Sequence, residues 1–135
     1  MNYLVGDIGN TSIKVSILNH KFNIKKSYYL ETKKIYKKKN SSIFFKKILN
    51  KNINQNILFS SVVPKAYKVI KNYLKEKNYR SFEVKDLKIR KIIKINIKNF
   101  DQLGSDRIVN AIGVNNCKNC VIIDFGTATT FDIIK

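Results

Sequence analysis

Two apolar stretches near opposite ends of the chain each finish on an aspartate, and glycine and threonine follow within a few residues. The first reads DIGNTSIK at residues 7–14, and the second reads DFGTATT at residues 124–130. Strand-like residues flank both motifs, and apolar and polar positions alternate after the first. This pattern is typical of two strands joined by a tight turn. The sequence therefore predicts two β-hairpins of similar plan.

Between the hairpins, apolar residues predict an alternation of strands and helices. Pro64 suits the first turn of a helix, and Ser41 and Ser42 are N-cap candidates for an earlier one. Residues 86–100 lack a clear period and are expected to lie extended over the surface. The expected strands are 2–8, 12–18, 22–31, 56–63 and 81–84, and residues 120–135 are expected to form a strand, a turn and the start of another strand. The expected helices are 42–52, the segment after Pro64 and one through 108–112. Three strands followed by strand–helix units predict an α/β fold with a mixed sheet.

The charge of the chain is strongly positive, at +18, and such a balance can indicate a nucleic-acid partner. The basic residues are almost all lysine, however, whereas nucleic-acid surfaces favour the planar fork of arginine. Lysine, isoleucine and asparagine also dominate the strands of the expected core, as an A/T-rich genome would produce. We therefore expect solvated lysines that keep the protein soluble, and no nucleic-acid partner.

Targeting and cysteine signals are weak. The apolar runs are too short to cross a bilayer, and the N-terminus does not resemble a secretory signal. We expect a cytoplasmic protein without membrane contact. Cys117 and Cys120 are interpreted as ordinary thiols, because His20 is the only histidine and a structural zinc site needs four ligands.

The first hairpin carries more polar chemistry than a turn requires. As a plain turn it needs only Gly9 and Asn10, which tolerate a positive φ. A turn does not explain Asp7 at the end of a buried-type strand, where a carboxylate needs a cation or donors. The functional interpretation is a phosphate site. Backbone N–H groups and the hydroxyls of Thr11 and Ser12 would face an anion, and Asp7 would reach Mg²⁺ directly or through water.

The second hairpin repeats this chemistry. Asp124 ends an apolar strand, Gly126 turns the chain, and the following threonines supply hydroxyls: Thr127, Thr129 and Thr130. One such hairpin is weak evidence for a ligand site. Two in one small chain are stronger, and their separation fits a nucleotide held between two lobes.

A third motif, LGSDRIVNA at 103–111, lies at the start of an expected helix. Ser105 or Asp106 would be a favourable helix cap. Capping leaves Arg107 unexplained, because a cation in the first turn opposes the helix dipole. An arginine there is better placed to face a carboxylate or phosphate, and Asp106 beside it to accept a proton from a substrate hydroxyl. Gly104 would let the backbone approach a ligand closely.

Together DIGNTSIK, SSVVP, LGSDRIVNA and DFGTATTFD, in this order and at these spacings, resemble the type III pantothenate kinase family, which includes Baf-like proteins. The resemblance covers essentially the whole chain. It implies the actin/Hsp70/sugar-kinase superfamily and homodimers of two ribonuclease-H-like domains, about twice this length. Such proteins phosphorylate pantothenate with ATP in the first step of coenzyme A synthesis, and they require K⁺ or NH₄⁺ besides Mg²⁺.

The resemblance also implies roles for individual residues. Asp106 falls on the proton acceptor, Arg107 on the group facing the pantothenate carboxylate, and Asp124 on the monovalent-cation ligand. Gly104, Ser105, Asp106 and Arg107 fall on the pantothenate-binding segment. The implied ATP-binding residues are Asp7, Ile8, Gly9, Asn10, Thr11, Ser12, Ile13, Lys14 and Thr127.

The sequence departs from the family pattern at two positions. Ile97 stands where the family usually has Tyr, and Phe100 where it has Pro. The resemblance further predicts a ribonuclease-H-like domain over 1–115, with a mixed sheet and flanking helices. It predicts that 116–135 are the first strands of a second, truncated domain.

Two other classes of function remain open from the residues alone. Asp7, Asp106 and Asp124 could form a two-metal nuclease cluster on a ribonuclease-H-like sheet, although a nuclease has no use for two phosphate-binding hairpins. The chain could also be a non-enzymatic Baf-like regulator or a catalytically impaired fragment.

Overall fold

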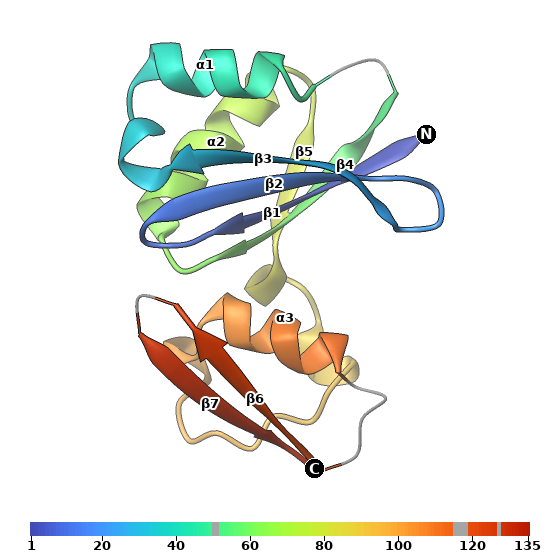
Figure 1. Cartoon of the computed structure of the whole chain (residues 1–135), viewed down its shortest axis with the longest axis vertical. Helices are drawn as coiled ribbons and strands as arrows, with labels where there is room; N and C mark the ends of the chain where they lie inside the picture. The colour runs from blue at the N-terminus through green and yellow to red at the C-terminus, as the bar shows by residue number, and fades with distance from the viewer. Residues whose placement is uncertain (50–51, 115–118, 127) are drawn as a thin grey trace.

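The upper part of the molecule is a five-stranded sheet (Figure 1). The computed structural model describes residues 1–49, 52–114, 119–126 and 128–135. The strands of this sheet are β1 (Asn2–Ile8), β2 (Ser12–Leu18), β3 (Ile24–Glu31), β4 (Ile53–Ser61) and β5 (Arg80–Glu83), in the order β3-β2-β1-β4-β5. β1–β2 and β2–β3 pair antiparallel, whereas β1–β4 and β4–β5 pair parallel. The predicted mixed sheet is therefore confirmed.

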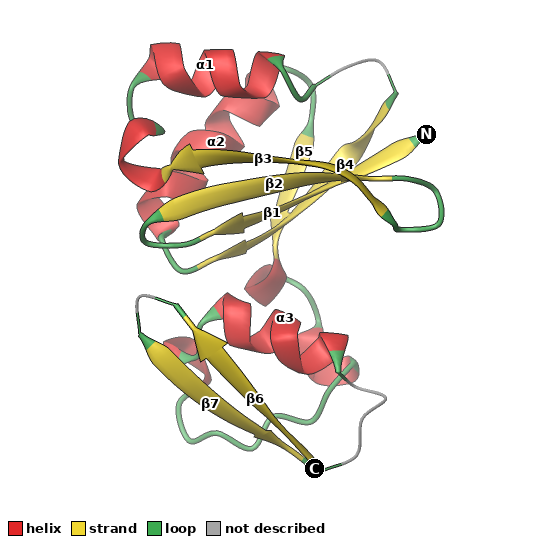
Figure 2. Cartoon of the chain, viewed as in Figure 1, coloured by secondary structure: helices red, strands yellow, loops and turns green. Residues whose placement is uncertain are grey.

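Two helices, α1 (Lys38–Lys46) and α2 (Pro64–Glu76), cover one face of this sheet (Figure 2). The alternation in β2 buries Ile13, Val15 and Ile17 beneath them, as its sequence predicts. Pro64 occupies the first turn of α2, where its missing N–H costs nothing. The apolar stripe of α2 joins side chains of the sheet and of α1 in one continuous core.

Several element boundaries differ from the prediction. The first helix begins at Lys38 rather than near residue 42, and Ser41 is not its cap, because its hydroxyl donates to the Lys38 carbonyl at 3.0 Å. Burial of Phe44 and Phe45 fixes this helix, and its polar start has no side-chain cap. The third strand begins at Ile24, since Phe22 has a φ of 61° in the preceding turn. The strands predicted at 56–63 and 81–84 run over Ile53–Ser61 and Arg80–Glu83.

The lower part contains α3 (Ser105–Gly113) and a hairpin of β6 (Cys120–Phe125) and β7 (Thr129–Ile134), which lie side by side (Figure 1). A chain of short 3₁₀ turns links it to the sheet: Val84–Asp86, Ile89–Lys91 and Phe100–Gln102. Residues 86–100 are thus only partly extended. Ile89 folds inward and packs with Leu103 and Ile108 in a second, smaller core.

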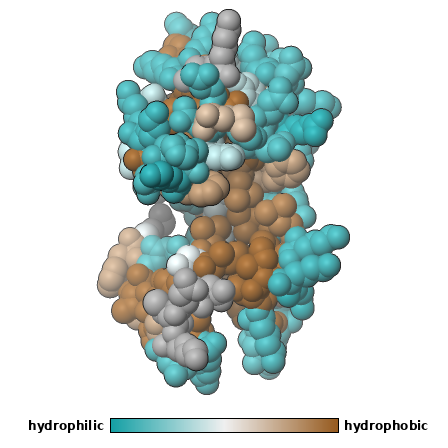
Figure 3. Space-filling view, turned by 90° about the vertical axis from the view of Figure 1, so that its right-hand side faces the viewer, coloured by the Kyte–Doolittle hydropathy of each residue, from teal (hydrophilic) through white to brown (hydrophobic). Residues whose placement is uncertain are grey.

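One face of the β6–β7 hairpin is apolar and exposed. Its side chains are Val121, Ile123, Phe125, Phe131 and Ile133, each 48% exposed or more. Figure 3 shows that apolar surface gathers on the lower part of the molecule, whereas the upper part is largely hydrophilic. A strand pair alone cannot cover both of its faces, so the inner face is covered by α3 and the outer one is open.

Candidate active site

The two predicted hairpins come together in space. The β1–β2 turn and the turn end of the β6–β7 hairpin lie on the same side of the molecule, and α3 also begins on that side (Figure 1). The carboxylates of Asp106 and Asp124 are near enough to raise the pKa of Asp7. The fold therefore gathers aspartates from three separate segments, as expected for one site built from all three motifs.

Asp7 is the residue on which these interactions converge. In the sheet it lies opposite Lys14 of β2 and Ser60 of β4. Asp7 retains contact with solvent, yet loss of hydration is the main cause that raises its pKa, followed by the like charges of Asp106 and Asp124. The Ser60 hydroxyl and the Lys14 ammonium oppose this rise.

Ser60 is a site residue that the sequence did not single out. It is buried at the end of β4, and its hydroxyl makes no hydrogen bond of regular geometry, but it lies close enough to the Asp7 carboxylate to lower its pKa. The sequence feature that could have indicated Ser60 is the motif SSVVP, which lies at the carboxyl end of a strand parallel to β1. Ends of parallel strands meet at one sheet edge, where ligand sites form.

The first turn differs in detail from the phosphate site that was predicted. The N–H of Gly9 donates to the Ser12 carbonyl at 2.9 Å, so it closes the turn and does not face outward. Neither Gly9 nor Asn10 has a positive φ. The hydroxyl of Thr32 donates to the Gly9 carbonyl at 2.7 Å and holds the turn against the start of the following 3₁₀ helix, Thr32–Lys34. Asn10, Thr11 and Ser12 are exposed at the tip.

Not every residue predicted to bind ATP presents a side chain to solvent. Ile8 and Ile13 are 0% exposed and belong to the core, so only their main chain is left for a ligand. They flank the turn as a directly opposed pair. Their burial fixes the turn on the core. Side-chain contacts to a ligand could then come only from the polar residues at the tip.

The second turn follows a similar plan with one residue fewer. Asp124 lies opposite Thr130, and Phe125 opposite Thr129. The Gly126 N–H donates to the Ala128 carbonyl at 3.3 Å, much as Gly9 does in the first hairpin. Thr127, predicted to contact ATP, lies outside the described residues.

The Asp106 carboxylate occupies the space beside Gly104 that a side chain at this position would need. A Cβ on Gly104 would collide with the Asp106 Oδ1 and would stand 3.4 Å from a methyl group of Val62. Gly104 is itself the N-cap residue, and α3 has no side-chain cap. Asp106 instead accepts the Arg107 N–H at 2.8 Å, which fixes its carboxylate. The neighbouring Ser105 hydroxyl is buried without a partner among the described residues.

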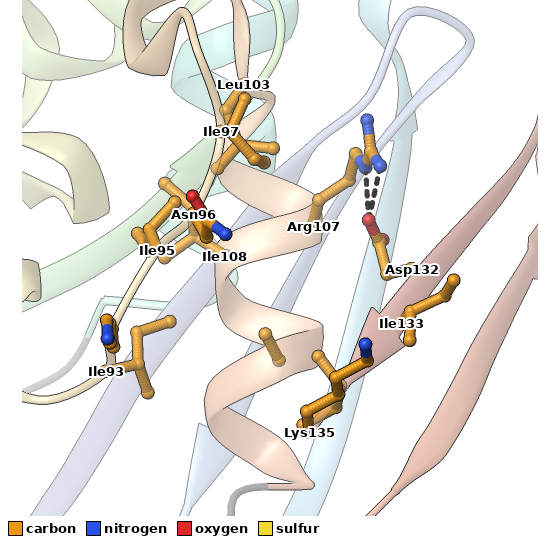
Figure 4. A pocket seen from close by; sticks show the side chains of 13 residues that line it. Ile93, Ile95, Asn96, Ile97, Leu103, Arg107, Ile108, Asp132, Ile133 and Lys135 are labelled. Atoms are coloured by element: carbon orange, nitrogen blue, oxygen red, sulfur yellow. Dashed lines mark hydrogen bonds and ion pairs between the residues drawn. The ribbon is translucent and has the colours of Figure 1, made fainter.

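Arg107 is held by Asp132 of β7 (Figure 4). Its Nε donates to Asp132 Oδ1 at 2.7 Å, and its Nη2 contacts the same oxygen. This hydrogen bond and the carboxylate charge raise the pKa of Arg107, with a smaller contribution from Asp106. Asp132 is the second residue that the sequence did not single out, although it closes the motif DFGTATTFD.

Beside this ion pair lies a groove of about 590 Å³. Its walls are mostly apolar and come from residues 93–97, Leu103, α3 and the end of β7. Arg107 and Asp132 are charged residues at its edge (Figure 4). Ile97, at the position where the family pattern has Tyr, lines the same groove.

Neither a shared metal cluster nor a membrane helix occurs in the described part of the chain. No three His, Cys, Asp or Glu residues there are close enough to hold one ion together. The two-metal nuclease interpretation thus has no geometric support within these residues. None of the helices described is both long and apolar enough to cross a bilayer. Cys120 is a free thiol, and Cys117 lies outside the described residues.

The fold and the gathered aspartates define an α/β protein with a mixed sheet, flanking helices and one acidic candidate site. The Lmo2764 protein from Listeria monocytogenes, a candidate N-acetylmannosamine kinase, superposes with a TM-score of 0.53 at 13% identity, over 99% of this chain and 47% of that one. The model of one family, type III pantothenate kinase, matches residues 3–135. The chain belongs to the type III pantothenate kinase family.

Individual relatives agree with this assignment. The type III pantothenate kinase of Pelagibacter ubique is 46% identical over 97% of this chain and 53% of its own length. That of Persephonella marina is 39% identical over 70% of this chain and 38% of its own. That of Fervidobacterium nodosum is 30% identical over 98% and 54%. The chain therefore spans about half the length of the curated relatives it matches.

Proposed function

We propose that this chain provides the phosphate-binding and substrate-binding part of an ATP-dependent pantothenate kinase. The observation that carries the proposal is the convergence of Asp7, Asp106 and Asp124 on one site. Membership of the type III pantothenate kinase family supports the choice of pantothenate as acceptor. The reaction would be the first step of coenzyme A synthesis, in the cytoplasm.

Asp106 is proposed as the proton acceptor. The primary hydroxyl oxygen of pantothenate attacks the γ-phosphorus of ATP, its proton passes to the Asp106 carboxylate, and the bond to ADP breaks in line. The Arg107 N–H fixes one Asp106 oxygen, so the carboxylate is oriented before substrate arrives. Arg107 would bind the pantothenate carboxylate, with Gly104 and Ser105 beside it.

The aspartates suit cations that accompany ATP. Asp7 and Asp124 form no ion pair with a cationic side chain among the described residues, and the repulsion that raises the Asp7 pKa would be relieved by bound cations. Oxygen ligands are those that Mg²⁺ and K⁺ prefer. We assign Asp7 to Mg²⁺, directly or through water, and Asp124 to K⁺ or NH₄⁺. When bound, these ions neutralise charge on the phosphates.

The tips of the two hairpins are proposed to bind the ATP phosphates. Asn10, Thr11 and Ser12 are exposed at the first tip, and Lys14 lies opposite Asp7 in the β1–β2 pair. Thr127 is proposed as a contact from the second tip. Because the Gly9 N–H closes its own turn, hydroxyls and side-chain charge carry more of this binding than backbone N–H groups.

We also propose that β6 and β7 begin a second ribonuclease-H-like domain after a first one over residues 1–115. The exposed apolar face of the hairpin supports this proposal, since such a face needs a partner layer. The whole protein is proposed to act as a homodimer.

Calorimetry of the purified chain tests the proposal. Titration with ATP and with pantothenate, in Mg²⁺ and K⁺, is expected to show binding of both, and a coupled assay should detect ADP only when pantothenate is present. Binding of both ligands without turnover would favour a catalytically impaired fragment or a Baf-like regulator. Failure to bind either ligand would overturn the proposal.

A further inference from the structure

Asp132 holds the guanidinium of Arg107 in one orientation. The Nε and Nη2 donors both contact Asp132 Oδ1, and Nη2 also donates to the Phe131 carbonyl at 3.3 Å. The side chain of Asp132 is only 13% exposed, whereas that of Arg107 is 34% exposed. A carboxylate that is mostly shielded from water forms a stronger and more rigid contact than a surface ion pair.

These contacts involve the Nε and Nη2 edge of the guanidinium and do not involve Nη1. Nη1 has no hydrogen-bond partner among the described residues, and the nitrogen farthest from Asp132 points away from it in Figure 4. An arginine fixed in this way has already lost the rotamer freedom that binding would otherwise remove. The free nitrogen is then available to a second anion at a defined position.

Arg107 also connects this contact to the proton acceptor. Its backbone N–H donates to Asp106, and its side chain is bound by Asp132 on a different element. Asp132 therefore fixes the side chain of a residue whose main chain fixes the Asp106 carboxylate. If the guanidinium were displaced, substrate binding would be affected first. The hydrogen bond from the Arg107 backbone N–H to Asp106 lies within the first turn of α3 and does not involve the guanidinium.

We propose that Asp132 is a positioning residue for substrate binding, which holds Arg107 so that Nη1 receives the carboxylate of the acceptor substrate. This inference rests on the proposed function. It assigns a role to the last aspartate of DFGTATTFD, which neither the phosphate chemistry nor the cation site uses.

Two other roles make different predictions. If Asp132 only fastened β7 to α3, its loss would lower stability and weaken every ligand alike. If it competed with the substrate for Arg107, its loss would tighten substrate binding. Only a positioning role makes the effect specific to the substrate carboxylate.

The test compares wild type with Asp132→Asn and with the conservative Asp132→Glu. Asp101→Asn is the matched control, since Asp101 is exposed and lies outside the groove. Binding is measured by calorimetry with pantothenate and with pantothenol, in which a hydroxymethyl group replaces the carboxylate. A non-hydrolysable ATP analogue, Mg²⁺ and K⁺ are present throughout. Thermal unfolding and the Arg107 Nε–H resonance report folding and the state of the guanidinium.

Asp132→Asn is expected to weaken pantothenate binding by about tenfold or more and to broaden the Arg107 Nε–H resonance, with pantothenol binding unchanged. Asp132→Glu should restore part of the loss. The inference is overturned if Asp132→Asn binds pantothenate as tightly as wild type, or more tightly, or if it weakens both ligands equally. A wild-type chain that binds ATP but no pantothenate overturns the proposed function, and this inference with it.

Arg107→Ala provides a second check, as the other arm of a double-mutant cycle with Asp132→Asn. In an Arg107→Ala background, Asp132→Asn should cause no further loss of pantothenate affinity, because the residue through which it acts is gone. A further loss of equal size in that background would contradict the inference.

Discussion

Asp7 and Ser60 lie directly opposite each other at the carboxyl ends of the parallel strands β1 and β4. The carboxylate is pushed toward its protonated form by loss of hydration and by two neighbouring aspartates, and the Ser60 hydroxyl is the largest influence that opposes this. A single buried hydroxyl thus helps to keep Asp7 charged. A charged Asp7 is the form that binds a cation.

Replacement of Ser60 by Ala should therefore raise the pKa of Asp7 further. The pH at which Mg²⁺–ATP binding is half lost on acidification is expected to move upward, because a larger fraction of Asp7 is protonated at a given pH. Calorimetric titrations over a pH series measure this shift. Ser42→Ala, in α1, is the control and should leave the pH profile of Mg²⁺–ATP binding unchanged. If Ser60→Ala also left this profile unchanged, Ser60 would not influence Asp7.

The raised pKa of Asp7 also predicts the pH dependence of folding. As pH rises above 3.8, the unfolded chain loses this proton before the folded chain does, so folding stability falls until pH passes the raised folded pKa. Asp7→Asn removes this loss. Relative to wild type, the variant is expected to gain stability across that window and to keep the gain at neutral pH, while Mg²⁺–ATP binding is lost.

Chemical denaturation of both proteins at several pH values provides the measurement. The comparison is made without Mg²⁺, because a bound cation would offset the repulsion. If Asp7→Asn were less stable than wild type at neutral pH, the Asp7 carboxylate would stabilise the fold. It would then not be a site residue whose charge costs stability.

The sequence predicted the sheet and the hairpins because their signals are local. Alternation in β2 and the glycine-containing turns depend on residues a few positions apart. The start of α1 was misplaced because its N-terminal turn is lysine-rich and uncapped, so only burial of Phe44 and Phe45 defines it. Burial depends on partners from elsewhere in the chain, which single-sequence patterns do not contain.

The same distinction applies to the candidate site. Asp7, Asp106 and Asp124 each stand in a local motif, so the sequence could single them out. Ser60 and Asp132 gain their importance from a cross-strand register and a contact between β7 and α3. No periodicity along the chain encodes those contacts. At the first turn, the Gly9 N–H donates to the Ser12 carbonyl, so it is not among the backbone N–H groups that could face an anion.

The position of the Asp106 carboxylate beside Gly104 predicts a specific effect of one methyl group. Gly104→Ala places a Cβ too close to the Asp106 Oδ1, so the carboxylate must move. A displacement of about 1 Å at a reacting group can lower a rate by about a hundredfold. We expect a loss of that order in pantothenate-dependent ADP formation. Gly113→Ala, at the other end of α3 with nothing within 4 Å, is the matched control and should retain the wild-type rate.

Asp106→Asn separates chemistry from binding. The amide oxygen of Asn can still accept the Arg107 N–H, so the start of α3 is expected to keep its shape. The amide cannot take up the substrate proton, and the rate of phosphoryl transfer should fall by orders of magnitude while ATP and pantothenate still bind. Single-turnover kinetics with calorimetry measure both. Wild-type turnover by this variant would show that another group accepts the proton.

Ile97 offers a test in the direction of gained function. It is 45% exposed and lines the groove beside Arg107, at the position where the family pattern has Tyr. A phenol there adds a polar donor to an apolar wall within the same groove as the substrate-binding arginine. Ile97→Tyr is expected to tighten pantothenate binding by about tenfold, with ATP binding unchanged. Ile92→Tyr, at an exposed site outside this groove, controls for the added ring. If both variants bind pantothenate as wild type does, the substrate does not lie in the groove. Arg107 must then bind the substrate carboxylate on the side that faces away from the groove.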